Sequence, residues 1–171
     1  MAESNLITIS DVQVYRRIDP KFNADRFGAF VMDIQRVNLR QLLGDALYLD
    51  FFANISDTKY SDLRVGKDYT YNSQTIHYYG LKPYLCYLWL SIAAREGDLF
   101  LTNYGTIQLN NNPQQAFERA SERDRIAVQY IETATSYAND IVKFLNENAA
   151  TYLLWVRSGE SNKTNFISFR I

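Results

Sequence analysis

The sequence predicts a mainly α-helical protein: a helical bundle with one very long C-terminal helix, a small extended or β excursion, and an extended C-terminal tail. Three observations lead to this fold class. Apolar residues recur every three or four positions over residues 113–148 and again over residues 81–96, which is the period of a helix. Between residues 56 and 79 that period is lost. Because 171 residues suit a single core, we expect one helical domain over residues 1–155 and a tail over residues 156–171.

The N-terminal part of the chain predicts two helices. Ser10 can cap a short helix that runs through Val12 and Tyr15. A second helix is expected over Ala24–Leu43, where apolar residues fall on one stripe. Gly44 ends this helix, because glycine readily takes the left-handed conformation that helix C-termini favour.

An unusually apolar stretch follows at residues 46–53. Asp45 can cap a short helix there, and its leucine, tyrosine and phenylalanine residues leave almost no polar face. We therefore expect this helix to be buried.

Residues 56–79 form a polar, tyrosine-rich excursion. Ser61 and Asp62 can hold one helical turn. Beyond them, aromatic and polar residues alternate on both sides of Asn72 and Ser73, which predicts a hairpin or an extended loop. An excursion of this length is typical of a functional or interfacial segment.

The two strongest helices come next. The helix over residues 81–96 is apolar nearly all round, so we expect it at the centre of the bundle. Residues 102–109 predict a strand or a turn. The long helix then begins at Pro113, whose missing N–H would have no intrahelical partner, and runs to Asn148. Its roughly 36 residues span about 54 Å, so we expect a scaffold and not a reaction centre.

Two features of the C-terminal part of the chain indicate contacts with other subunits or with a sheet. Asp124 interrupts the apolar seam of the long helix, and it indicates either an open end of the bundle or a salt bridge to a partner subunit. Residues 165–171 are mostly apolar, whereas free tails are usually polar. We expect this segment to dock as a strand on its own sheet or on a neighbour.

Composition and motifs exclude several classes of function. A formal net charge of −1 gives no basic surplus for nucleic-acid binding, and we expect a cytosolic origin because no signal sequence or membrane-spanning segment is evident. Cys86 is expected to be a core residue, and His77, with no cysteine neighbour and no histidine at i+4, a hydrogen-bonded loop histidine. No nucleotide-binding loop, hydrolase elbow or CxxC pair occurs, so we expect no enzyme, cofactor or metal. The thirteen tyrosines, ten phenylalanines and two tryptophans build either a thick aromatic core or surfaces for partner subunits.

The order of these features resembles a known protein family. The chain carries LITISD near its start, then LLGD, YYGLKPYL and the small-residue turn TNYGTIQ, followed by the long helix. Over residues 5–155 it resembles short proteins encoded in the structural gene blocks of tailed phages and prophages of gut Bacteroidetes, crAss-like phages included. None of these motifs is catalytic. The tail after Trp155 lies outside the resemblance.

The resemblance implies a structural virion protein, a head-to-tail connector or adaptor that forms a ring of twelve subunits below the portal. Such a protein is made in the host cytoplasm and lies in the neck of the virion. It binds the portal protein on one side and another connector or tail protein on the other, while DNA passes through the channel without specific binding. A ring interface is heterologous, so each subunit needs two different contact surfaces. The candidate interface residues are Lys67, Tyr69, Tyr71, Ile76, His77 and Tyr78 in the loop, Asp124 on the long helix, and Phe166, Ile167, Phe169 and Ile171 in the tail.

Three other interpretations remain open. The first is another virion part, such as a neck or tail-completion protein or a second ring in the same stack, which only the identity of the bound neighbour would distinguish. A small helical enzyme or regulator would use the loop around His77 as a pocket. A non-viral, cytosolic interaction module would pair through the alanine-rich seam of the long helix, although packing against residues 81–96 explains that seam equally well.

Overall fold

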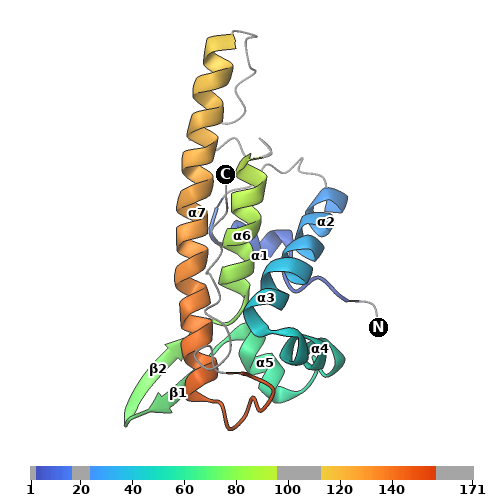
Figure 1. Cartoon of the computed structure of the whole chain (residues 1–171), viewed down its shortest axis with the longest axis vertical. Helices are drawn as coiled ribbons and strands as arrows, with labels where there is room; N and C mark the ends of the chain where they lie inside the picture. The colour runs from blue at the N-terminus through green and yellow to red at the C-terminus, as the bar shows by residue number, and fades with distance from the viewer. Residues whose placement is uncertain (1–2, 17–23, 96–112, 157–171) are drawn as a thin grey trace.

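The computed structural model describes residues 3–16, 24–95 and 113–156, and its architecture is the predicted helical bundle with a small hairpin. Figure 1 shows the long helix α7 running the length of the molecule, with α6 beside it and the helices α2 and α3 on the far side of α6. The helices α4 and α5 and the hairpin gather at the lower end in that view. The elements are α1 (Ile9–Gln13), α2 (Ala24–Ile34), η1 (Gln35–Leu39), α3 (Arg40–Leu43), α4 (Asp45–Ala53), α5 (Thr58–Val65), β1 (Lys67–Tyr71), β2 (Gln74–Tyr78), α6 (Lys82–Arg95) and α7 (Pro113–Glu147).

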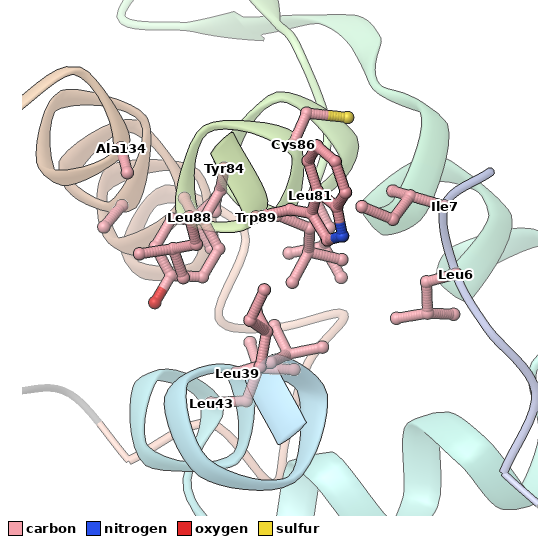
Figure 2. Packing of buried hydrophobic residues seen from close by; sticks show 14 of the residues in the cluster. Leu6, Ile7, Leu39, Leu43, Leu81, Tyr84, Cys86, Leu88, Trp89 and Ala134 are labelled. Carbon is pink, nitrogen blue, oxygen red and sulfur yellow. The ribbon is translucent and has the colours of Figure 1, made fainter. Parts of the chain in front are cut away.

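The helix α6 is the centre of the bundle, as its all-round apolar sequence predicts. Figure 2 shows Trp89 of α6 among Leu39 of η1, Leu43 of α3 and the N-terminal residues Leu6 and Ile7. Every one of these side chains is at most 5% exposed. At roughly 1.5–3 kcal/mol for each large apolar side chain, burial on this helix is a main source of stability.

The helix α7 meets α6 through small residues. Ala127, Ala134 and Ala138 are buried along the seam and permit close approach of the two backbones, and the larger Ile141 and Phe144 fill the lower end. The predicted helix over residues 113–148 is confirmed to within one residue at its C-terminal end. Cys86 lies in the core on α6, also as predicted.

The helix predicted over residues 24–43 differs in its middle. Residues 35–39 are π-helical, so the helical run continues with one wider turn. That turn directs Gln35 inward, where its Oε1 accepts from the Leu6 backbone N–H at 2.7 Å and its Nε2 donates to the Ser4 carbonyl at 3.1 Å. The π-helical turn is therefore accompanied by hydrogen bonds to the N-terminal segment, and helical periodicity in the sequence does not reveal it.

Two predicted helix starts are corrected by the structure. Thr8, and not Ser10, caps α1, because the Thr8 side chain and the Asp11 carboxylate satisfy each other's backbone N–H groups. Asp45 is the first residue of α4 and not its cap, and its carboxylate accepts from Arg40 at 2.8 Å. The predicted ending of the preceding helix at Gly44 is confirmed by a φ of 76° there.

Two further helices differ in burial or in length. Leu47, Tyr48 and Phe51 of α4 are buried as predicted, whereas Leu49 is 59% exposed, so the helix covers the core with one face only. The single turn expected near Ser61 is the eight-residue helix α5. The predicted strand or turn over residues 102–109 and the tail over residues 156–171 lie outside the described residues, apart from Val156.

Candidate interface

The hairpin is the element that the sequence singled out, and its register fixes which residues share a face. Strand β1 pairs antiparallel with β2, and Tyr69 lies opposite Ile76. The two turn residues, Asn72 and Ser73, have φ values of 49° and 62°, the left-handed pair that a tight two-residue hairpin requires. Side chains alternate between faces, so the hairpin has an inner face toward α7 and an outer face toward solvent.

The inner face is joined to the lower end of α7 by aromatic rings. The ring of Tyr78 stacks on that of Phe144, with centroids 4.0 Å apart and planes within 4° of parallel. The Tyr78 hydroxyl donates to the Leu63 carbonyl at 3.0 Å, and burial raises the pKa of this phenol well above its usual value. The ring of Tyr69 meets Phe144 edge-on at 5.2 Å, and the Tyr69 hydroxyl donates to the carboxylate of Glu147.

This packing corrects one predicted interface residue. Tyr78 is 2% exposed, so its side chain belongs to the core and does not offer a contact surface. Tyr69 and Ile76 are half-buried on the same face. Lys67 is also only half-exposed, and its ammonium group pairs with Asp62 of its own chain at 2.8 Å.

The outer face of the hairpin is polar and open. His77 Nδ1 lies 2.6 Å from an Asp68 carboxylate oxygen, with 58% and 66% of the two side chains exposed. The prediction of a hydrogen-bonded loop histidine is thus confirmed, and the Tyr79 ring stands edge-on to the imidazole at 4.6 Å. A pair this exposed contributes little to stability, about 1 kcal/mol at most, because water and salt screen it. The pair is therefore available for contacts outside the chain.

Two apolar groups project at the same end of the molecule. Tyr71, at the tip of the hairpin, is 41% exposed. In the turn that follows α7, Leu153, Leu154 and Val156 are 84%, 44% and 66% exposed. Figure 1 shows this turn and the hairpin together at the lower end of α7. Sequence reasoning missed the turn, although three large apolar residues within four positions after a helix are a readable signal.

The turn after α7 is held in place by two buried side chains. Tyr152 is 3% exposed and its hydroxyl donates to the Lys59 carbonyl at 2.7 Å. The Trp155 indole N–H donates to the Asn146 side-chain oxygen at 2.9 Å. Because these two residues point inward, the residues between and beside them point outward.

A row of tyrosines runs from Tyr79, just after the hairpin, across α7 and α6 to Tyr15, just after α1. The Tyr79 ring lies 6.1 Å from Tyr137, Tyr137 stacks on Tyr87 at 5.8 Å, and Tyr87 lies 5.2 Å from Tyr15. Tyr79 is exposed and the other three are half-buried, so the tyrosine rings here contribute both to the packed interior and to the surface. Tyr130, seven residues before Tyr137 on α7, also lies 6.1 Å from Tyr87, and this spacing on one helix face was the available signal.

The remaining predicted residues are placed as follows. Asp124 is exposed on α7. Phe166, Ile167, Phe169 and Ile171 lie outside the described residues.

The described ranges contain no group of three or more histidine, cysteine, aspartate or glutamate residues placed to hold a metal ion. Within the same ranges, no helix combines the length and the apolar character needed to span a bilayer. Burial raises the pKa of the Cys86 thiol to about 12, which keeps it protonated in its packing position.

The chain matches a protein-family model over most of its length. The model of DUF6712, a family of unknown function, matches residues 39–165. No curated protein and no solved structure matches the chain.

Proposed function

We propose that this chain, which belongs to the DUF6712 family, is a structural virion protein: a subunit of the head-to-tail connector ring that docks below the portal and joins it to the tail. The class of protein comes from the sequence resemblance over residues 5–155. In this proposal the chain performs no chemistry and needs no cofactor. Its partners are other copies in a ring of twelve, the portal protein, and a further connector or tail protein.

One observation carries the proposal furthest: two different surfaces project at the same end of a rigid bundle. The first is the hairpin with Tyr71 at its tip, and the second is the turn with Leu153 and Leu154. A ring needs such a pair, because each subunit shows one face to the next subunit and another to the previous one. Exposed large apolar residues that gather in a patch are typical of interaction sites.

The charge pattern of α7 supports a channel that does not hold DNA tightly. Its described exposed residues carry both signs of charge: Asp124, Glu132 and Asp140 are acidic, and Arg125 and Lys143 are basic. Strong phosphate binding requires a surplus of lysine and arginine. Mixed charges of this kind let a duplex pass.

The test is the mass of the complex formed with and without a candidate portal ring, measured by light scattering on purified proteins. We expect a ring-sized complex on the portal. If the protein associates with no virion partner, the proposal fails and a cytosolic interaction module is the better hypothesis.

Matched variants sharpen this test. Val156→Ser and Val37→Ser remove the same side chain from positions that are 66% and 62% exposed, but Val37 lies on η1, between α2 and α3, and not in the turn after α7. We expect Val156→Ser and Tyr71→Ser to weaken assembly at least about tenfold, as removal of an anchor worth more than 1.4 kcal/mol does. Val37→Ser should assemble normally. Equal effects at the two valines would argue against the lower end as the contact surface.

The tail can be tested in the same assay. Deleting residues 161–171 should leave the bundle folded and weaken ring formation, because the described core is built without them. A truncated protein that assembles normally would remove the tail from the interface.

A further inference from the structure

The base of the hairpin is a crossing of two backbones at glycine. Gly66 immediately precedes β1 with a φ of +99°, and Gly80 follows β2 by two residues with a φ of +82°. A Cβ at Gly66 would lie 2.3 Å from the Tyr78 carbonyl oxygen, and a Cβ at Gly80 would lie 2.5 Å from the Arg64 carbonyl oxygen. Each chain segment thus occupies the space that a side chain on the other would need.

Hydrogen bonds also join the two chain segments that meet at these glycines. The Leu81 N–H donates to the carbonyls of Leu63 and Arg64 at 3.2 and 3.1 Å, which ties the start of α6 to the end of α5. The Tyr78 hydroxyl also donates to the Leu63 carbonyl. The two ends of the hairpin are therefore fixed to each other and to two helices.

A third helix holds the inner face. The stack of Tyr78 on Phe144, with the hydrogen bond from Tyr69 to Glu147, attaches the strands to the end of α7. The tip from Tyr71 to Thr75 is exposed. An isolated two-stranded hairpin is only marginally stable in water, so these contacts at the base are what can keep the strands folded.

We propose that the β1–β2 hairpin is a rigid arm whose direction is set within the single chain by the Gly66–Gly80 crossing, so that it is already folded before it meets a neighbour. That the neighbour is another ring subunit rests on the function proposed above; the rigidity of the arm does not. A preformed arm loses little conformational entropy on contact, which leaves more of the contact energy for assembly.

Hydrogen exchange on the full-length protein tests the arm directly. At a concentration where light scattering gives the monomer mass, we expect hairpin ladder amides to exchange at least about 100-fold slower than unstructured amides. Their protection should change less than about tenfold on assembly. Amides that are unprotected in the monomer and become protected only in the complex would overturn the proposal.

A matched pair of glycine variants tests the crossing. Gly80→Ala and Gly44→Ala both place alanine at a positive φ, but a Cβ at Gly44 meets no atom within 4 Å. We expect Gly80→Ala to speed hairpin exchange at least about tenfold more than Gly44→Ala, with smaller changes in the exchange of α6 and α7. Equal effects of the two substitutions would show that the crossing does not hold the arm.

A second measurement keeps the proposal testable if Gly80→Ala does not fold. Spin labels at Thr75→Cys and Asn139→Cys leave both glycines in place, and both positions are exposed while Cys86 is buried. One narrow distance distribution in the monomer is expected, and a broad one would refute a rigid arm. A rigid arm on a protein that never joins a virion complex would overturn the proposed function alone.

Discussion

Replacing Phe144 with alanine should be among the most damaging single changes outside α6. Phe144 is 1% exposed, and three rings contact it: Tyr69, Tyr78 and Tyr152 lie 5.2, 4.0 and 5.7 Å away between centroids. Loss of a buried phenylalanine costs about 3–5 kcal/mol in transfer and cavity terms. Because proteins of this kind have total stabilities of roughly 5–15 kcal/mol, about a fifth or more of the free energy of unfolding would be lost.

Urea unfolding followed by circular dichroism measures this loss. With a slope of about 2–3 kcal/mol/M for a chain of this size, the midpoint should fall by about 1–2.5 M. Phe52→Ala is the control, since Phe52 is only half-buried on α4 and should cost less. In hydrogen exchange the hairpin should lose protection before α6 does. A destabilisation below about 1 kcal/mol would show that Phe144 does not join the hairpin to the bundle.

Three other predictions concern a carboxylate, a buried amide and the core. The hydrogen bond from Tyr60 holds the pKa of Asp50 below its usual 3.8, so the ionised carboxylate stabilises the fold near neutral pH. This contribution to the free energy of unfolding is lost as the pH falls below about 4. Urea midpoints measured from pH 7 to 3 should therefore decrease, and Asp50→Asn should make that decrease smaller. Gln35→Leu leaves the Leu6 N–H buried without its partner and should cost about 1–3 kcal/mol, measured by thermal unfolding, whereas an unchanged melting temperature would contradict the role given to this amide. Leu88→Asp places an unpaired charge on α6 at a position 4% exposed and should unfold the chain, so a soluble, cooperatively melting variant would show that the core is misplaced.

Local sequence patterns were sufficient for the helices α6 and α7, and they reduced residues 67–79 to a hairpin or an extended loop. Long stretches with a period near 3.6 identify a helix whatever surrounds it, and the alternation around Asn72 and Ser73 identifies a tight turn. The register of the strands, with Tyr69 opposite Ile76, is what puts Tyr69 and Tyr78 on one face. Alternation does not show that this face turns inward either, because the ring that receives both belongs to Phe144, far along the chain.

Two predictions about burial were wrong for the same reason: a local pattern does not show which face of an element the rest of the chain covers. Tyr78 was predicted as a surface residue because it is one of several tyrosines in a polar stretch, but its ring is in the core. Leu49 was predicted to be buried because its helix is so apolar, but only one face of α4 meets the bundle. Residue type alone does not decide which side of an element is covered.

The sequence by itself determined the number and order of the main helices near the C-terminal end, the place of the hairpin, and the central role of α6, because these depend on neighbours within a few positions. Only the tertiary structure decided the π-helical turn at Gln35, the inward face of the hairpin and the direction of that arm. Each of these depends on atoms that are remote in sequence: the Ser4 and Leu6 backbone, the Phe144 ring, and the crossing of Gly66 with Gly80. Contacts of that kind form only when the chain closes on itself, so a local pattern carries no record of them.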